Sequence, residues 1–159
     1  MIQIKKADLS ISEQANSIIG LLNEYALHPM GGGEALTEFT RNNLIAALQS
    51  RKECSVILAY DDDTAIGLCN CFEAFSTFAC KPLLNIHDLF VKEAYRKQGI
   101  ARQMMQKAEQ LAKHNGCCKM TLEVLSKNEA AKKSYLASGY KPYQLNEQFG
   151  NAEFWQKSL

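Results

Sequence analysis

Residues 95–102 read Tyr-Arg-Lys-Gln-Gly-Ile-Ala-Arg, and this stretch decides the fold that we expect for the chain. The apolar run Leu89-Phe90-Val91 precedes it. After it, apolar residues recur at helical spacing, namely Ile100, Met104, Ala108, Leu111 and Ala112. This spacing predicts a strand, a turn, and then a helix that begins near Gly99 or Ile100.

The charges at this turn are unusual for the start of a helix. A helix N-terminus exposes unpaired backbone N–H groups and favours acidic side chains. Here no acidic residue occurs between Glu93 and Glu109, and the turn carries the basic residues Arg96, Lys97 and Arg102. A phosphate bound to the backbone amides would make this arrangement favourable. Simple solvation of the basic side chains is the alternative.

The turn is not one of two common phosphate-binding loops. It lacks the P-loop pattern Gly-x-x-x-x-Gly-Lys-Ser/Thr, and it has one glycine where the dinucleotide fingerprint needs three. Instead, Arg96-Lys97-Gln98-Gly99-Ile100-Ala101 resembles the Arg/Gln-x-x-Gly-x-Gly/Ala signature of the GCN5-related N-acetyltransferases, the GNAT superfamily.

Three further segments carry the same resemblance. Asp88-Leu89-Phe90-Val91 with Tyr95 looks like the family's fourth strand and its exit. Asn128-Glu129-Ala130-Ala131, with Tyr135 and Gly139-Tyr140, looks like its Asn-x-x-Ala…Tyr…Gly-Phe segment, and Phe154-Trp155 resembles the closing strand. The resemblance covers residues 55–159 and implies acetyl-coenzyme A as co-substrate, with its pyrophosphate on the turn.

The resemblance also implies which residues bind this co-substrate. Backbone groups of Leu89, Phe90 and Val91 would hold the pantetheine arm and polarise the thioester carbonyl. Asn128 would also contact the coenzyme, although its position alone predicts a helix cap. The turn would contribute Arg96, Lys97, Gln98, Gly99, Ile100, Ala101 and Arg102.

Acetyl transfer from a thioester to an amine benefits from a proton donor for the leaving thiolate. Tyr135 lies two helical turns after Asn128, on the same predicted helix face. Taken alone, it could be a tyrosine half-buried between helix and sheet. The resemblance places the family's general acid here, and a coenzyme contact as well.

The general base is less well defined by the sequence. His87 and Asp88 are adjacent ionisable residues in an apolar strand, where strand alternation places them on opposite faces. His87 could accept the amine proton, or could be satisfied by backbone hydrogen bonds. Asp88 could bind a cationic amine or orient a water molecule. The remaining candidates are Glu123, Glu73 and Glu34.

The acceptor is not identified by the sequence. Residues 75–91 look similar to the diamine (spermidine/spermine) acetyltransferase branch, but Ile86-His87-Asp88 stands where that branch has Leu-Glu-Asp. Because one acidic residue is missing, the sequence does not commit the acceptor to a polyamine. The loop Pro29–Glu34 contains three consecutive glycines. It is either a lid, which would bring Tyr25, Met30 and Glu34 to the acceptor, or a connector that needs positive φ angles.

Composition limits the class of protein. The chain has 159 residues, of which 47% are hydrophobic, and a formal net charge of +1. We therefore expect one domain, residues 1–159, with no bulk attraction to nucleic acid or membrane. No apolar run approaches the ~20 residues of a membrane span, and the N-terminus does not resemble a signal peptide. We expect a cytoplasmic protein with its six cysteines reduced and no metal site.

The order of predicted elements indicates an α/β fold. We expect strands near residues 2–5, 56–60, 65–75, 83–91, 120–125, 140–145 and 152–157. Ser10–Glu13 has capping-box spacing, and helices are expected after it, over 37–50, from 99 or 100 to 115, and over 128–137. The expected GNAT-like fold is a mixed, mostly antiparallel sheet with splayed central strands, flanked by about four helices.

The predicted function is therefore acetyl-coenzyme A-dependent N-acetylation of a primary amine, on a small molecule or a peptide, by direct transfer in a ternary complex. A non-catalytic acyl-coenzyme A-binding regulatory module is the alternative. A protein-interaction domain that binds no nucleotide would not explain the basic cluster at Arg96, Lys97 and Arg102. Family habit makes a homodimer a reasonable expectation.

Overall fold

The computed structural model describes residues 1–159 and divides the chain into two units, Met1–Leu122 and Glu123–Leu159. The first unit contains one five-stranded sheet with its strands in chain order. All neighbouring strands are antiparallel except the last two, which are parallel. The strands are β1 (Ile2–Lys6), β2 (Cys54–Asp61), β3 (Thr64–Ser76), β4 (Lys81–Val91) and β5 (Met120–Leu122).

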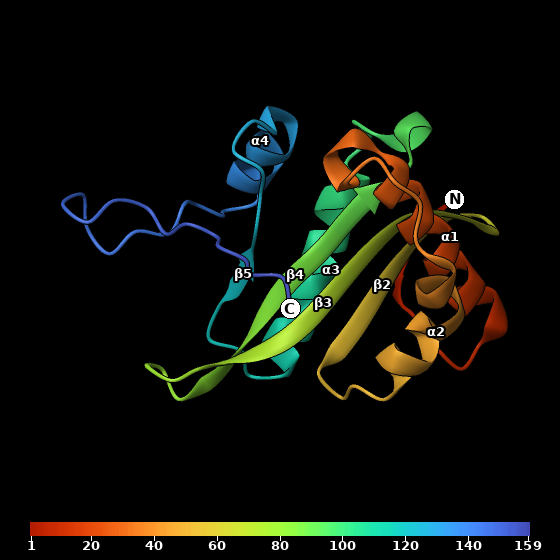
Figure 1. The fold of residues 1–159 in the computed structure, drawn as a ribbon, viewed down its shortest axis with the longest axis horizontal. Coiled ribbons are helices and arrows are strands. Elements are labelled where there is room, and N and C mark those ends of the chain that lie inside the picture. Colours follow the sequence, from red (N-terminus) through yellow and green to blue (C-terminus); the bar gives the residue numbers. More distant parts are fainter. The chain divides into compact units, whose positions relative to one another are not determined.

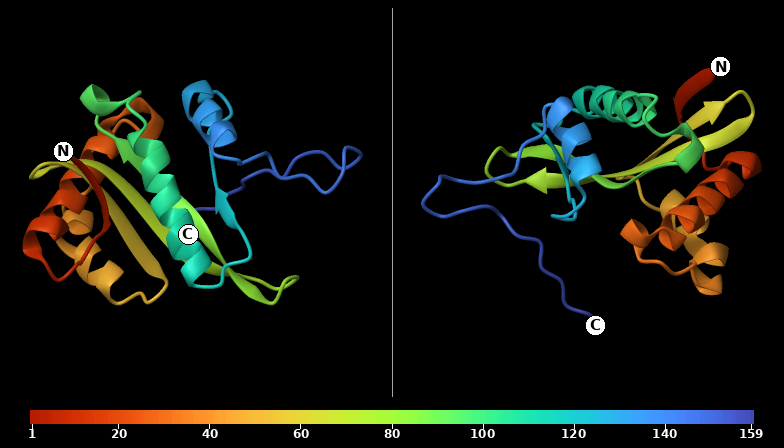
Figure 2. Two further views of the ribbon diagram at one scale, coloured as in Figure 1. Left: turned by 180° about the vertical axis from the view of Figure 1, so that it is seen from behind. Right: turned by 90° about the horizontal axis from the view of Figure 1, so that it is seen from above.

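Helices cover both faces of this sheet. The helices α1 (Ser12–Leu27) and α2 (Glu38–Gln49) lie on one face, and α3 (Ile100–His114) lies on the other (Figures 1 and 2). Strand alternation supplies an apolar surface to each layer. The core cluster on the α1 side consists of Ile18, Leu21, Leu48, Val56, Leu58, Tyr60, Leu68 and Phe90.

The docking of α3 depends on a close approach to the middle of the sheet. A Cβ atom added at Gly67 would lie 3.0 Å from Met104 Sδ and 3.2 Å from Phe90 O. Ile100 and Met104 are 2% and 0% exposed, so the first turn of α3 is anchored in the core. The start of this helix is therefore held at the end of β4.

The sheet opens between β4 and β5. Their pairing ends at Ile86 and Leu122, whereas β4 continues to Val91. The strand expected over 120–125 accordingly ends earlier, at Leu122, where its partner strand changes register against β3. The mixed, mostly antiparallel sheet, its splayed strands and the four helices confirm the expected fold class. No helix combines the length and apolar character that crossing a membrane requires.

The capping box expected at Ser10–Glu13 is wrong. The residue before α1 is Ile11, and no side chain caps the helix. The carboxylate of Asp8 accepts hydrogen bonds from both the backbone N–H (2.9 Å) and the hydroxyl (2.6 Å) of Ser10. This local turn directs the Ser10 hydroxyl to Asp8 and away from the N-terminus of α1, which begins two residues later, at Ser12. The predicted second helix does begin with a cap, because Thr37 accepts a hydrogen bond from the N–H of Thr40.

The second unit contains α4 (Glu129–Ala137), which Asn128 caps by accepting from the N–H of Ala131 at 3.2 Å. The two strands expected near 140–145 and 152–157 are wrong. Only an isolated bridge between Gln144 and Asn151 forms there. Pro142 has no N–H to donate to a ladder, which weakens strand pairing in this segment.

Two glycine variants test the packing of α3. We expect Gly67→Val to lower the free energy of unfolding by about 1–3 kcal/mol, because the side chain overpacks the contact with Met104. Gly20→Ala is the matched control, since Gly20 lies in α1 with no atom within 4 Å of its would-be Cβ. It should instead raise stability by up to about 1 kcal/mol. Urea unfolding followed by circular dichroism measures both, and equal effects would contradict this packing.

Candidate active site

The turn between β4 and α3 has the backbone geometry of an anion-binding site. It runs through a short 3-10 helix, η2 (Glu93–Tyr95), and then through Lys97 and Gly99 at positive φ angles of 61° and 78°. Gly99 precedes α3 directly, no side chain caps the helix, and its first turn has no acidic residue. The first backbone N–H groups of α3 therefore lack the partners that caps usually supply. A Cβ at Gly99 would meet nothing within 4 Å, so the approach is open.

The three basic side chains of the turn have different roles in the structure. Arg96 donates through Nε to the backbone oxygen of Val91 at 3.0 Å, and its guanidinium lies 5.8 Å from the centre of the Phe90 ring. It therefore ties the turn to β4. Lys97 and Arg102 are exposed and take part in none of the ion pairs of the structure. These two are the cations available to an anion at this turn.

An extra residue in β4 changes the orientation of the side chains expected to act as base. Asp88 pairs with Asn70, but the next pair is Ile86 with Cys71, so His87 is inserted without a partner on β3. Such a bulge interrupts the alternation of side chains along a strand. The prediction that His87 and Asp88 occupy opposite faces is wrong, because both line one pocket.

This pocket lies between α1, α2 and the sheet and has a volume of about 350 Å³. Its polar side chains include Asn70, His87 and Asp88. The remaining lining is mostly apolar or aromatic and consists of Leu22, Tyr25, Ala26, Gly31, Leu36, Leu44, Leu48 and Phe72. A concave apolar site with a few convergent polar groups is typical of small-molecule binding.

Contacts within the pocket hold its polar groups in place. Asn70 donates through Nδ2 to Oδ2 of Asp88 at 2.9 Å. The rings of Phe72 and His87 meet edge to face, with centroids 5.6 Å apart. Burial raises the pKa of Tyr25, and the negative charge of Asp88 raises it further, so this phenol stays protonated. Its ring stacks on Phe90 at 5.5 Å.

The glycine-rich loop forms one edge of the pocket. It begins with a 3-10 helix, η1 (Pro29–Gly31), and continues through Gly32 and Gly33 at φ angles of 122° and 81°. A Cβ at Gly31 would lie 2.0 Å from the backbone oxygen of Tyr25. These features fit the connector interpretation. Of the three residues that a lid would bring to the acceptor, Tyr25 lines the pocket, whereas Met30 and Glu34 do not.

The other predicted site residues lie elsewhere. Asn128 and Tyr135 belong to the second unit, where Tyr135 is half-buried with its ring 6.1 Å from that of Tyr140. A site shared between them and the turn stays a prediction, as does a role for Glu123. Glu73 accepts a hydrogen bond from Asn115 at 3.0 Å and does not line the pocket.

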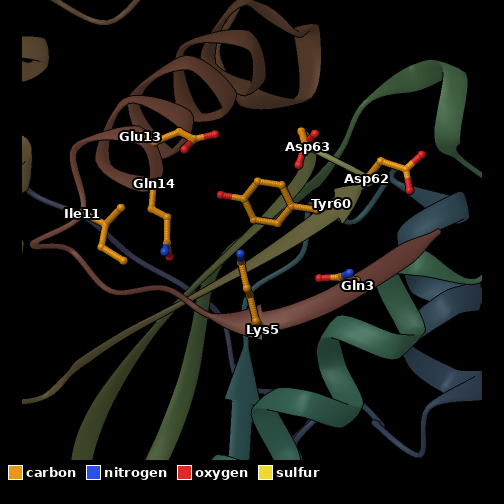
Figure 3. A pocket seen from close by; sticks show the side chains of 8 residues that line it. All are labelled: Gln3, Lys5, Ile11, Glu13, Gln14, Tyr60, Asp62 and Asp63. Carbon is orange, nitrogen blue, oxygen red and sulfur yellow. The ribbon is translucent and has the colours of Figure 1, made fainter.

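A second depression lies beside β1 and the start of α1 (Figure 3). Its lining includes Lys5, Glu13, Tyr60 and Asp62, and Lys5 lies 4.4 Å from the centre of the Tyr60 ring. It contains neither the turn nor the bulge, and we assign it no chemistry. No group of three or more His, Cys, Asp or Glu side chains is arranged to hold a metal ion.

Asn70 and Phe72 are pocket residues that sequence reasoning missed. A signal for Asn70 was present, because it is the one polar residue among the apolar and small residues Ala65–Cys71. A lone amide in a buried strand requires a hydrogen-bond partner. The partner proves to be Asp88, on the neighbouring strand.

Comparisons with known proteins agree with this geometry. The model of the acetyltransferase (GNAT) family matches residues 21–140. The uncharacterized N-acetyltransferase YhfO of Bacillus subtilis (strain 168) is 27% identical over 88 residues, which are 55% of this chain and 59% of YhfO. The match thus spans less than two-thirds of that relative.

Solved structures are similar over nearly the whole chain. The crystal structure of a probable acetyltransferase is 26% identical, with a TM-score of 0.81 and 99% of each chain covered. AAC(6')-Iy, in complex with a bisubstrate analog of coenzyme A and acetylneamine, is 15% identical, with a TM-score of 0.78; 100% of this chain and 99% of that one are covered. The latter likeness concerns the fold alone. Because the family match spans most of the chain, and the turn, the open sheet and the fold agree with it, the chain belongs to the acetyltransferase (GNAT) family.

Proposed function

We propose that the chain is an acetyl-coenzyme A-dependent N-acetyltransferase that acetylates a primary amine by direct transfer in a ternary complex. The uncapped N-terminus of α3, flanked by Lys97 and Arg102, is the observation that carries this proposal. The name of YhfO and the coenzyme A analog bound to AAC(6')-Iy support it. The acceptor belongs to a small molecule or a peptide.

The residues of the turn fit a pyrophosphate. Backbone amides of Gly99, Ile100, Ala101 and Arg102 would donate to its oxygens, with Gln98 beside them, since the partial positive charge of a helix N-terminus favours an anion there. The side chains of Lys97 and Arg102 would add charge-assisted contacts. Arg96 would act by holding the turn against Val91.

The pantetheine arm would lie where β4 continues beyond its pairing with β5. Backbone groups of Leu89, Phe90 and Val91 lie in this segment. Acetyl-coenzyme A would supply the thioester that the amine attacks. Asn128 is proposed as a further contact, in addition to capping α4.

Three side chains, those of His87, Asp88 and Tyr135, would act in the proposed acetyl transfer. In the pocket, His87 would accept the proton that the amine loses, and Asp88 would hold the amine. The amine nitrogen bonds to the carbonyl carbon, the carbon–sulfur bond breaks, and Tyr135 would give its proton to the departing thiolate. A phenol is suited to this step because it remains protonated at neutral pH.

The cysteines favour direct transfer over a covalent acyl-enzyme. Cys69 and Cys71 are both buried, with their sulfur atoms 3.6 Å apart. The hydrogen bond to Cys71, together with burial, raises the pKa of Cys69 well above its usual value. A thiol in this state is a poor nucleophile.

The same turn would also serve a non-catalytic acyl-coenzyme A-binding module, and release of free thiol with an amine panel distinguishes the two. A cytoplasmic location and a homodimer stay predictions.

Coenzyme binding tests the turn. We expect the double variant Lys97→Glu/Arg102→Glu to weaken the affinity for coenzyme A by about tenfold or more, because it removes two charge-assisted contacts. The double variant Arg51→Glu/Lys52→Glu, at two exposed residues before β2, makes the same charge change away from the turn and should have little effect. Isothermal calorimetry at low salt measures each affinity. An unchanged affinity in the double variant would remove the main support for this proposal.

The variant Tyr135→Phe, which lacks only the phenolic oxygen, tests the proposed role of Tyr135 as the general acid. Turnover of the best amine should fall by about 10²-fold or more, the range expected for loss of a general acid. The affinity for coenzyme A should stay within about twofold, since a fold-change that small is well under 1 kcal/mol. Full turnover in this variant would rule out the proposed acid.

A further inference from the structure

We propose that the acceptor of this enzyme is a small monoamine with an apolar or aromatic body, whose ammonium is held by Asp88 with Asn70 as the positioning residue. The inference concerns the pocket between α1, α2 and the sheet, and it rests on the proposed function, because this pocket would be the acceptor site.

Asn70 has an incomplete set of hydrogen bonds. This residue is 3% exposed and donates to Oδ2 of Asp88 at 2.9 Å. A carboxylate accepts and does not donate, so the amide nitrogen faces Asp88 and the amide oxygen faces away. That oxygen, Oδ1 of Asn70, is buried and has no hydrogen-bond partner.

A buried acceptor without a donor is unfavourable, and such groups in native proteins require an explanation. Leucine would fill a similar volume in this apolar strand without that cost. An amide at this position does what leucine cannot, since its Nδ2 fixes one oxygen of Asp88 at the pocket. The other carboxylate oxygen can then accept from the N–H groups of an ammonium.

The only carboxylate that lines the pocket belongs to Asp88. Asp88 takes part in none of the ion pairs of the structure. The other titratable side chains that line the pocket are Tyr25, which burial keeps protonated, and His87. The pocket therefore presents one uncompensated carboxylate, which matches a ligand with one positive charge.

The rest of the pocket lining is mostly apolar or aromatic. The ring of Tyr25 is stacked on Phe90 and that of Phe72 meets His87, so both rings are held in place. Around them the pocket is lined by Leu22, Ala26, Leu36, Leu44 and Leu48. A polyamine or an aminoglycoside would bury further charges and hydroxyls against these walls without partners, at a large cost in affinity. A volume of about 350 Å³ also favours a compact ligand.

Equilibrium binding of four probes tests this class directly. The probes are 2-phenylethylamine, its uncharged analogue 2-phenylethanol, spermidine and kanamycin. Calorimetric titrations are made on the full chain with and without coenzyme A. We expect 2-phenylethylamine to bind about tenfold or more tightly than each of the others, because 2-phenylethanol loses a charge-assisted hydrogen bond and the other two bury polar groups without partners.

Three variants test which side chains produce the preference for 2-phenylethylamine. Asp88→Asn and Asn70→Leu should each weaken 2-phenylethylamine about tenfold or more. Both should leave the weak binding of 2-phenylethanol unchanged, which distinguishes positioning of the ammonium from general damage to the pocket. Asp63→Asn, an exposed carboxylate in the β2–β3 turn, is the matched control and should bind as the wild type does. If Asn70→Leu does not fold, Asp88→Asn alone decides.

Tighter binding of spermidine or kanamycin, undiminished amine binding by Asp88→Asn, or no binding of 2-phenylethylamine would each overturn the proposed class. These results do not depend on turnover. Acetylation of spermidine or kanamycin would uphold the proposed function while overturning the inference. Selective binding of 2-phenylethylamine without acetylation of any amine would uphold the proposed ligand class while overturning the proposed function.

Discussion

The N-terminus of α3, with its partial positive charge, is exposed beside the basic side chains of Lys97 and Arg102, and the proposed site depends on this arrangement. Nothing within α3 compensates this arrangement, so it is held by packing elsewhere. Ile100 and Met104 are buried against the sheet where Gly67 permits close contact. Arg96 adds a bond from the turn to the end of β4. The site is therefore already formed before an anion binds, and this preorganisation lowers the entropic cost of binding.

One strand, β4, relates this turn to the pocket. Its end leads into the turn, its edge is left open beyond Ile86, and its bulge at His87 directs two ionisable side chains into the same cavity. Asn70 on β3 then holds Asp88. The pairing of β4 with β5 ends at Ile86, and the bulge that interrupts the alternation of side chains lies at the next residue, His87. In the proposed reaction, the strand would present backbone groups to one substrate and side chains to the other.

The elements that were predicted correctly are those with strong local signals. The helical spacing after Gly99 and the helix expected over 37–50 agree with the structure, since each depends on residues close in sequence. The bulge could not be foreseen, because period-two alternation contains no signal for an inserted residue. The cap at Ser10 failed because the turn at Asp8 directs its hydroxyl away from the helix, and the last strands failed because only an isolated bridge forms there. The pocket itself brings together residues from five elements, which no local pattern encodes.

The central claim is that the backbone amides at the start of α3 bind a phosphate group of coenzyme A. The most direct measurement is a nitrogen–proton correlation spectrum recorded while coenzyme A is added. The account predicts that the amide signals of Gly99, Ile100, Ala101 and Arg102 move downfield and saturate together, since each would donate a hydrogen bond to the anion. If these four signals stay fixed while others move, or if none moves at saturating ligand, the account is contradicted.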